Sequence, residues 1–408
     1  MNLSCQSIIN MERPGQGILD LNRAGLDRIF FPLYVKFPEL KEDNKSEKIL
    51  KKYSPDTVGE RYGPVLEKCM ANDIRTAFLK TPVVPPKSDF SAILPMLETS
   101  MVQSLALCKT AGCSFLLMEL PVQLMGNGRD DWRTVYDYFF HMAKTAHGYG
   151  ITLLLKNQVK DTGGHLVRGF CAEASEALEW VDKLNLGLGY QAFGFCVDTG
   201  ICNICGNNIQ TFIHTLGKRI KAVILRDNDG RKDVSMLPFT CAGSGTDWLG
   251  VVRGLRDINF DGELAVDFSN TYGSFSPLLR PALYPLVRRT MEYFKWQTEM
   301  ENNLKRYRKS VLFGAGNMCR NYMKCYGGKY PPLFVCDNNP ETWGTIFEGL
   351  EVKSPEALKQ LPKDCCVVIC NIFYREIEMQ LHEMEIENIG YFNDEYMPSF
   401  YFDRLDNG

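Results

Sequence analysis

The chain has 408 residues, a formal net charge of −3, 45% hydrophobic residues and 23% charged residues. This composition is typical of a soluble globular protein, and it excludes the basic balance of most nucleic-acid binders. No apolar run reaches the ~18 residues that span a bilayer, and the start MNLSCQSIIN lacks the regions of a signal peptide. We expect a cytoplasmic protein of two domains, or a barrel plus an extra module, without nucleic-acid or membrane partners.

Short apolar runs rich in β-branched residues and phenylalanine recur through the first two thirds of the chain. Continuous runs of this kind are typical of strands that are buried on both faces. Segments with helical spacing lie between them, including 92–110, 132–147 and 171–184, with Gly187 as a stop signal. Eight βα units predict a (β/α)8 barrel over residues 1–290. The eight runs are 2–9, 28–35, 73–79, 113–120, 151–156, 192–198, 219–227 and 262–268.

The stretch Ser276–Tyr307 predicts a long helix that is broken near Pro281 and Pro285. Its polar, basic end favours a solvated helical linker over residues 291–308, although a phosphate-binding patch is the alternative. A second pattern of short strands and helices follows, and it predicts a small Rossmann-like βαβ domain over residues 309–408.

One Cys-x-x-Cys pair, Cys202 and Cys205, lies in FGFCVDTGICNICGN (193–207). A structural zinc site needs four ligands, and the chain has no second pair. The intervening Asn203-Ile204 does not suit a thioredoxin-type motif. We expect both thiols to be structural, like most of the fifteen cysteines of a protein in a reducing compartment.

A glycine turn, Gly314-Ala315-Gly316, follows a predicted strand and opens a predicted helix. The first glycine permits the turn and the second lets backbone amides approach a pyrophosphate. Asp337 ends the next strand, where an acid that binds ribose is expected, but Cys319 stands at the third glycine position. Either Gly314, Gly316 and Asp337 bind a nucleotide or nucleotide-sugar, or the turn is purely topological.

Residues from about 309 to 393 resemble the small Rossmann-like modules attached to bacterial glycan-biosynthesis proteins. The resemblance implies a sugar or nucleotide-sugar context, and no particular reaction. It rests on Asp337-Asn338-Asn339, Trp343-Gly344, GLEVKSPEAL and VVIC.

The segment from Phe193 to Asp267 resembles the sugar phosphate isomerase/epimerase barrels of the xylose isomerase-like superfamily. The matching phrases are FCVDTGICN, LGKRIKAVILRDNDGRKDVSMLP and GSGTDWLGVVRGLRDINFDGELAVDF, and a weaker resemblance extends over residues 1–290. It implies a divalent metal at the barrel mouth, held by Glu, Asp, His and Glu. It also implies isomerisation or epimerisation beside a carbonyl, which the metal polarises while a carboxylate moves the proton.

Most positions of that ligand set are changed in this chain. Asp198 and Asp233 are kept, Lys156 stands for the glutamate of strand five, and Asp267 shortens the terminal glutamate. The histidine positions hold Ile201, Ile224 and Ser235.

An ammonium and two isoleucines do not suit a divalent ion, so we expect no metal there. Magnesium on Asp198, Asp233 and Asp267 is the remaining alternative. We expect Lys156 to pair with Asp198 and Asp267 and to stay charged, which favours binding an oxyanion or phosphate over Schiff-base chemistry. The other reading is an ion-pair cluster that only closes the mouth.

Further polar residues stand at predicted strand ends or in loops. Glu119 is a catalytic candidate because it ends a strand at the mouth. His165, in the loop DTGGHLVRG, is the histidine best placed for acid–base work. Arg226 could form an ion pair with Asp227 or reach a phosphate. The candidates for substrate binding are Asn157, Arg226, Asp227 and Asn228.

The chain therefore predicts a sugar or sugar-phosphate isomerase/epimerase relative of carbohydrate or surface-glycan metabolism, with a degenerate metal site. The alternative is a catalytically inactive barrel that serves as a sugar-binding or scaffolding module. Its partner is a small-molecule sugar or sugar phosphate in either case, and an oligomer is compatible with the sequence.

Overall fold

The computed structural model describes residues 1–34, 57–82, 90–121, 124–125, 131–241, 245–362 and 364–392. These residues divide into two compact units. The first holds residues 1–247 and 260–292, and the second holds residues 248–259 and those after 292. Helix α11 (Leu283–Arg306) carries the chain from the first unit into the second, and the expected barrel limit at residue 290 falls inside it.

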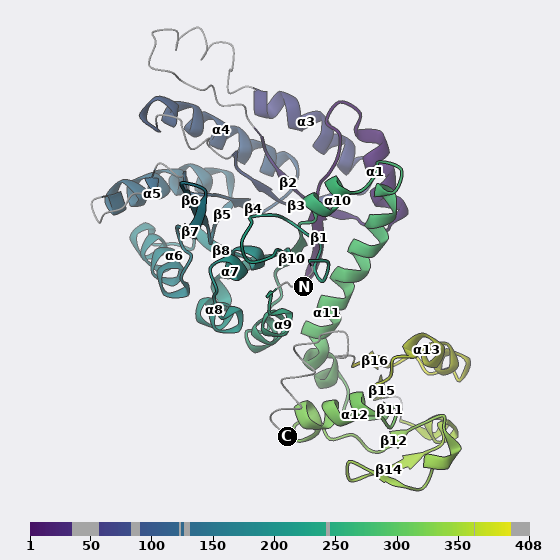
Figure 1. Ribbon diagram of the computed structural model, residues 1–408. Coiled ribbons are helices and arrows are strands. Elements are labelled where there is room, and N and C mark those ends of the chain that lie inside the picture. Colours follow the sequence, from purple (N-terminus) through teal and green to yellow (C-terminus); the bar gives the residue numbers. More distant parts are fainter. Residues whose placement is uncertain are drawn as a thin grey trace. The chain divides into compact units, whose positions relative to one another are not determined.

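Eight parallel strands of the first unit close into a barrel in the order β1-β10-β9-β8-β5-β4-β3-β2 (Figure 1). The predicted (β/α)8 barrel is confirmed, and each predicted apolar run overlaps one of its strands. The strands are β1 (Asn2–Gln6), β2 (Arg28–Pro32), β3 (Arg75–Lys80), β4 (Phe115–Leu117), β5 (Thr152–Lys156), β8 (Phe193–Asp198), β9 (Ile220–Leu225) and β10 (Glu263–Val266).

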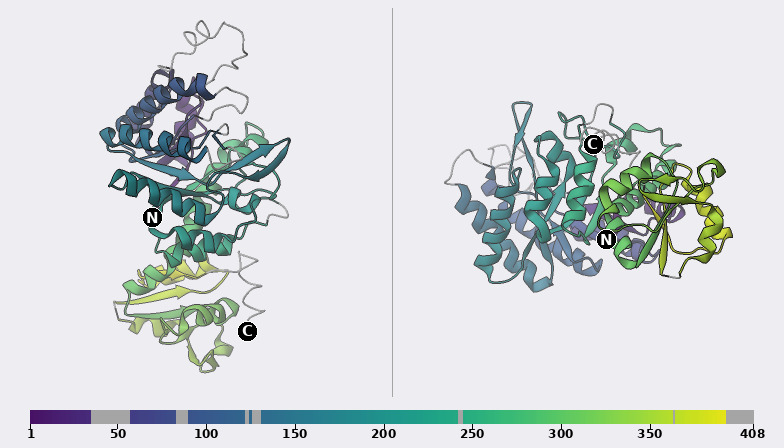
Figure 2. Two further views of the ribbon diagram at one scale, coloured as in Figure 1. Left: turned by 90° about the vertical axis from the view of Figure 1, so that its left-hand side faces the viewer. Right: turned by 90° about the horizontal axis from the view of Figure 1, so that it is seen from below.

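Helices of the first unit lie outside these strands, as the two further views of Figure 2 also show. They bury apolar faces against the sheet, which is the arrangement that a parallel sheet requires. None of the helices among the described residues is long and apolar enough to cross a bilayer. The helices are α1 (Pro14–Arg23), α3 (Thr57–Met70), α4 (Phe90–Thr110), α5 (Asp131–Tyr149), α6 (Ala174–Leu188), α7 (Thr199–Ile204), α8 (Ile209–Leu216) and α10 (Ser269–Ser274).

Three local predictions differ from the structure. Helix α6 continues past Gly187, and Gly189, with φ of 77°, ends it because glycine adopts the left-handed conformation without strain. The loop after β5 contains an antiparallel hairpin, β6 (Val159–Thr162) and β7 (His165–Arg168). Residues 276–279 are not helical, and a short 3₁₀ turn, Arg280–Ala282, precedes α11.

The second unit contains a six-stranded mixed sheet in the order β13-β14-β12-β11-β15-β16. All neighbours pair in parallel except β13 and β14. Strand β11 lies between β12 and β15. The strands that follow it in the chain are first added on the β12 side, and then, from β15 on, on the other side, so the strand order reverses at β11. The elements are β11 (Lys309–Phe313), α12 (Asn317–Tyr322), β12 (Val335–Cys336), β13 (Ile346–Phe347), β14 (Leu350–Lys353), β15 (Cys365–Ile369), α13 (Tyr374–Glu383) and β16 (Ile389–Tyr391), with α9 (Trp248–Asp257) earlier in the chain.

Candidate active site at the barrel mouth

Charged side chains stand at the carboxyl ends of six barrel strands, each two positions beyond an apolar residue of one buried cluster inside the barrel. Successive side chains of a strand point to opposite faces, so residues two apart share a side. The apolar interior therefore continues into a ring of charges at the mouth. The charged residues are Lys80, Glu119, Lys156, Asp198, Arg226 and Asp267, and they follow Phe78, Leu117, Leu154, Cys196, Ile224 and Ala265.

The signs of these charges alternate from strand to strand. Lys80 Nζ lies 2.9 Å from Glu119 Oε1, and Lys156 Nζ lies 3.1 Å from the same oxygen. Lys156 Nζ also donates to Asp198 Oδ2 over 3.0 Å. Each pair joins neighbouring strands, in the order β3, β4, β5 and β8. We call the whole set of linked groups the charge row.

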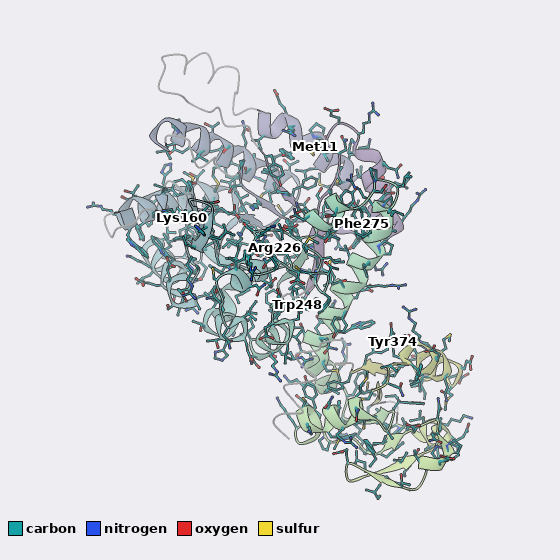
Figure 3. The ribbon with its side chains drawn as sticks, in the orientation of Figure 1. Met11, Lys160, Arg226, Trp248, Phe275 and Tyr374 are labelled. Carbon is teal, nitrogen blue, oxygen red and sulfur yellow. The ribbon has the colours of Figure 1, made fainter. Side chains whose placement is uncertain are left out.

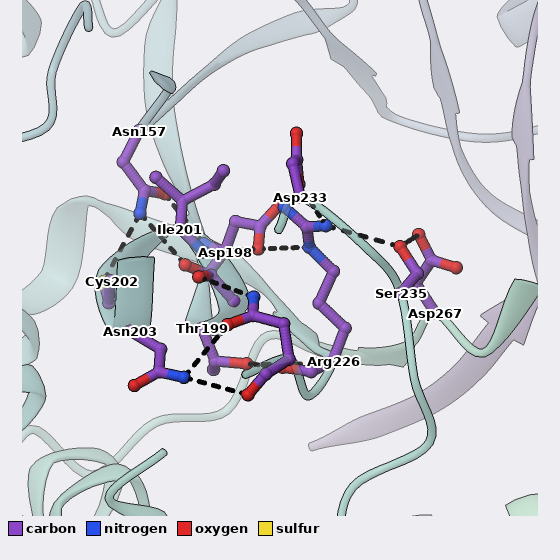
Figure 4. Close-up of polar contacts among 12 residues, drawn as sticks. Asn157, Asp198, Thr199, Ile201, Cys202, Asn203, Arg226, Asp233, Ser235 and Asp267 are labelled. Carbon is purple, nitrogen blue, oxygen red and sulfur yellow. Dashed lines mark hydrogen bonds and ion pairs between the residues drawn. The ribbon is translucent and has the colours of Figure 1, made fainter. Parts of the chain in front are cut away.

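Arg226, near the middle of the barrel in Figure 3, extends the charge row. Its Nε donates to Asp198 Oδ1 and its Nη1 to Asp233 Oδ1, both over 2.6 Å (Figure 4). Arg226 thus pairs with these two acids, and not with Asp227 beside it in the sequence. The guanidinium fits carboxylates at both ends because its donors form a fixed fork.

Asp267 ends the charge row without a cation at ion-pair distance among the described residues. It accepts from Ser235 Oγ over 2.8 Å and from Ser269 Oγ over 2.9 Å. The amide of Gln6, oriented with its nitrogen toward this acid, donates to Oδ2 over 3.0 Å. The expected pair of Lys156 with Asp267 does not form, and Glu119 takes that place. Strands β5 and β10 are three steps apart in the barrel, whereas β4 adjoins β5.

These contacts fix the protonation states of the charge row at neutral pH. Burial alone would raise the pKa of Glu119, but the ammonium groups of Lys80 and Lys156 lower it to about 2. Burial likewise opposes the charge of Asp198, yet Arg226 and Lys156 hold its pKa below the ordinary value. The carboxylates of Asp198 and Glu119 outweigh burial at Lys156 and raise its pKa. Lys156 is therefore an ammonium, which excludes it as a Schiff-base nucleophile at neutral pH.

Four further polar residues form hydrogen bonds within the protein at the mouth. Three of them were expected to bind substrate. Asn157 Nδ2 donates to the Asp198 carbonyl over 3.0 Å, and Asn157 Oδ1 accepts from the Asp198 amide over 2.8 Å. Thr199 Oγ1 donates to the Arg226 carbonyl over 2.9 Å and accepts from the Arg226 amide. Asp227 Oδ1 accepts from Thr246 Oγ1, and Asn228 Nδ2 donates to the Gly200 carbonyl. Asn157 and Thr199 therefore position Asp198 and Arg226, whereas Asp227 and Asn228 bind neighbouring segments of the chain.

A cavity of about 180 Å³ lies beside the charge row. Glu119, Lys156 and Asp233 line it together with Gln158 and the buried Ile201. Apolar side chains, including Leu97, Met101 and Met118, complete its wall. A pocket with a few converging charged groups on an apolar wall is the usual setting for a small polar ligand.

Two features singled out in the sequence lie apart from this chemistry. His165 is exposed in β7, at the turn of the hairpin, and does not line the mouth cavity. Cys202 and Cys205 are buried, and Cys202 Sγ accepts from Asn157 Nδ2 over 3.3 Å. All fifteen cysteines are free thiols.

Sequence reasoning missed Lys80, Gln6 and Tyr34 at the mouth. The run RTAFLK ends in a lysine just as TLLLK does, so Lys80 had a signal that could have been used. Gln6 is the last residue of β1 and Tyr34 follows β2, and neither side chain carries a charge that would have marked it. Burial raises the pKa of Tyr34, and the charge of Asp267 adds to that effect.

The residues at the mouth do not fit the divalent ion that the resemblance implies. Both oxygens of Asp198 already accept from cations, Lys156 and Arg226. Ile224 packs in the apolar cluster inside the barrel, and Ile201 is buried on the cavity wall. No group of three or more His, Cys, Asp or Glu with metal-ligand geometry occurs within the described ranges. A divalent ion would have to displace two internal cations before it could reach Asp198.

The glycine turn of the second unit is hydrogen-bonded to the acid expected to bind ribose, Asp337. Ala315 N donates to Asp337 Oδ2 over 2.7 Å, while Asp337 Oδ1 accepts from Asn339 N over 2.8 Å. Gly314 has φ of 113°, and a Cβ there would lie 2.8 Å from the Cys370 carbonyl. Glycine is therefore required at this position. Gly314 directly follows β11 and Asp337 directly follows β12, its neighbour in the sheet.

Family comparison matches two segments of the chain. Residues 99–285 match the model of the xylose isomerase-like TIM barrel, and residues 306–389 match the N-terminal C2185-like family. No curated protein matches the chain significantly. The first match covers residues of the barrel, and it agrees with the structural neighbours below on the TIM-barrel fold.

Solved sugar epimerases share the barrel fold at low sequence identity. An L-ribulose 3-epimerase has a TM-score of 0.53 and 15% identity over 76% of this chain and 99% of its own. A D-allulose 3-epimerase from Methylomonas sp. in complex with D-allulose has a TM-score of 0.52 and 15% identity over 73% and 97%. A D-psicose 3-epimerase from Clostridium cellulolyticum H10, with D-tagatose, has a TM-score of 0.52 and 12% identity over 72% and 99%. At these identities the likeness concerns the fold alone.

Proposed function

We propose that the barrel binds a sugar or sugar phosphate at its mouth and acts on it as an isomerase or epimerase without the family's divalent metal, in carbohydrate or surface-glycan metabolism. The observation that carries the proposal is the position of Lys156 Nζ on the cavity wall, 3.0 Å from Asp198 Oδ2 and 3.1 Å from Glu119 Oε1. A fixed positive charge is what the metal supplies to a carbonyl in this chemistry.

The ammonium of Lys156 has the hydrogen-bonding capacity for this task. It carries three N–H donors, and two of them face Glu119 and Asp198. The third has no acceptor within the described part of the chain. A substrate carbonyl in the cavity could accept it, and the bond would strengthen as negative charge develops on that oxygen.

Proton transfer then falls to Asp267. Glu119, with a pKa of about 2, is a weak base whose charge is committed to Lys80 and Lys156. Asp267 is held by hydroxyl and amide donors only, so its charge is not neutralised by an adjacent cation. In this proposal Lys156 polarises the carbonyl, Asp198 and Glu119 hold Lys156, and Asp267 moves the proton beside the carbonyl.

Solvent exchange tests the reaction directly. Ketoses, aldoses and their phosphates are incubated with the protein in D₂O, and proton NMR follows deuterium incorporation beside the carbonyl. We expect incorporation with at least one sugar, its loss in Lys156→Met and Asp267→Asn, and no loss in the surface variants Lys109→Met and Asp182→Asn. Stoichiometric divalent metal in the purified wild type, found by elemental analysis, would contradict the metal-free mechanism.

The second candidate is an inactive barrel that binds sugar, and the saturation of the charge row favours it. Both Asp198 oxygens and both lysines are already paired. Saturation-transfer NMR separates the two candidates, since it detects binding regardless of chemistry. Sugar binding without deuterium incorporation identifies the binding module, and binding with incorporation identifies the enzyme.

For the second unit we infer binding of a nucleotide or nucleotide-sugar at Gly314, Gly316 and Asp337. Support comes from the glycine requirement at Gly314 and from the position of the turn where the strand order reverses. A Cβ on Gly316 meets no atom within 4 Å, so Gly316→Val should fold but obstruct a phosphate. Measurement of the melting temperature with nucleotides and nucleotide-sugars tests this inference. A shift in the wild type that Gly316→Val removes supports it. No shift, or a shift that Gly316→Val leaves unchanged, contradicts it.

A further inference from the structure

We propose that a second cavity at the barrel mouth is an anion site that holds the phosphate of a phosphorylated sugar. The cavity has a volume of about 540 Å³ and lies among the loop after β1, the end of β2, α1 and α10. The inference rests on the proposed function for the position of the sugar ring. The anion site itself is argued from its own residues.

The charge of the cavity wall is positive. Arg13, Arg61 and Arg280 line it, and Asp20 is the one acid among the lining residues. None of the three arginines forms an ion pair with a carboxylate in the described ranges. Unpaired guanidinium groups that converge on one cavity are suited to a phosphate, because their fork of donors matches its oxygens.

Arg280 is held in place before any ligand arrives. Its Nε donates to the Phe275 carbonyl over 3.0 Å, and the guanidinium lies over the Tyr272 ring, 5.0 Å from the centroid. Arg61 lies over the Tyr62 ring at 5.7 Å. The Tyr62 hydroxyl in turn accepts from Tyr34 N over 2.7 Å. Side chains fixed in this way lose less entropy when they bind.

A buried donor without a partner lines the same cavity. Ser7 is only 8% exposed, and its Oγ has no hydrogen-bond partner among the residues that the structure describes. Its amide is already used, since it donates to the Phe30 carbonyl over 2.8 Å. An unpaired buried hydroxyl costs free energy, and a phosphate oxygen in the cavity would satisfy it.

The N-terminus of helix α1 faces the cavity as well. Gln16 and Gly17, in its first turn, line the wall, and Met11 of the preceding loop does too (Figure 3). The helix has ten residues, and its N-cap residue, Arg13, makes no side-chain cap. Its uncapped amides and the positive end of its dipole add to the attraction for an anion.

The cavity adjoins the charge row through shared residues. Gln6 and Ser269 line it, and both donate to Asp267. A sugar whose carbonyl lies near Asp267 can therefore extend its phosphate toward the arginines. This makes the substrate class a sugar phosphate rather than a free sugar.

Calorimetry and thermal shift with inorganic phosphate, D-glucose 6-phosphate, D-glucuronate and D-glucose test the site. We expect inorganic phosphate to raise the melting temperature, and glucose 6-phosphate to bind at least tenfold more tightly than glucose. Arg13→Gln/Arg61→Gln and Arg280→Gln should each weaken phosphate binding about tenfold, whereas the matched surface variant Arg133→Gln should not. Ser7→Ala should weaken binding without lowering stability in the absence of phosphate, because its hydroxyl is unsatisfied.

The outcomes separate this inference from the proposed function. Phosphate binding that depends on the arginines supports the anion site even when no sugar undergoes exchange in D₂O. Equal affinities for glucose and glucose 6-phosphate, together with no effect of inorganic phosphate, would overturn it. So would phosphate binding that the arginine variants leave unchanged, or tighter binding of glucuronate, which would make the ligand a carboxylate.

Discussion

Two sets of hydrogen bonds connect Arg226 to Asp198: one joins the two side chains, and the other joins the main chain of Arg226 to the residue after Asp198. The guanidinium donates to Asp198 Oδ1 over 2.6 Å, and the main chain of Arg226 exchanges two hydrogen bonds with the hydroxyl of Thr199, the next residue. Asp198 Oδ1 also accepts from Ile201 N and so caps helix α7. One buried pair thus fixes both the middle of the charge row and the start of a helix.

Breaking this pair should cost much more than breaking one on the surface. Arg226 and Asp198 are 5% and 3% exposed, so Arg226→Met leaves a buried carboxylate with one cation instead of two. We expect the free energy of unfolding to fall by about 3 kcal/mol. Arg219→Met, which removes an exposed partner of Asp182, should cost less than about 1 kcal/mol. Urea unfolding measures both, and equal losses would contradict the importance of the buried pair.

Glu119 should make stability depend on acid pH. Its folded-state pKa is lowered from 4.5 to about 2, so its stabilising effect is complete above pH 4.5 and is lost as the pH falls toward 2. The difference corresponds to about 3 kcal/mol. Unfolding measured between pH 6 and pH 2 should show a steeper loss in the wild type than in Glu119→Gln. Parallel curves for the two proteins would show that Lys80 and Lys156 do not stabilise the charged form of Glu119.

Gly200 should tolerate no side chain, because the mouth is closely packed around it. A Cβ there would lie 2.8 Å from Asn228 Nδ2 and 3.0 Å from both Cγ and Nε of Arg226. Gly200→Ala should lower the free energy of unfolding by about 1–3 kcal/mol. Gly148→Ala, in helix α5 with open space around it, should raise it by up to about 1 kcal/mol. Thermal unfolding of both variants checks the contrast, and a stabilised Gly200→Ala would refute the packing described for the mouth.

The thiols should differ sharply in reactivity. Cys325 is exposed and Cys241 is half-buried, while the other thirteen are buried. Burial also raises the pKa of Cys202 well above its ordinary value and that of Cys205 to about 11. Titration of the native protein with a thiol reagent should therefore give one fast and one slower group, and the rest only after unfolding. Fast labelling of Cys202 or Cys205, located by mass spectrometry, would reopen a redox role for that pair.

The sequence predicted the barrel well because strands buried on both faces leave continuous apolar runs. The hairpin of β6 and β7 was missed for the opposite reason, since its residues are exposed or half-buried and carry no apolar signal. The one available sign was Gly163-Gly164, both at positive φ in the turn.

The sequence pointed to most of the charged residues that the structure brings to the mouth, but not to how they pair. Lys156 was expected to pair with Asp198, and it does. Lys156 pairs with Glu119 rather than Asp267 because Glu119 ends the adjacent strand, whereas Asp267 ends a strand three steps away. This order follows from the predicted (β/α)8 barrel, so the signal was present in the sequence but was not used. Lys80 was overlooked because its role appears only beside Glu119 on the adjacent strand.

The positive charge at this mouth is part of the polypeptide. Lys156 and Arg226 bring it there as soon as the barrel has folded, so this charge needs no loading step and a chelator cannot remove it. The charge is also fixed in amount: it cannot be exchanged for a harder or softer ion when the cell's metal supply changes. Only a mutation can alter it, and any such change must be matched on the neighbouring strand to keep the remaining charges paired.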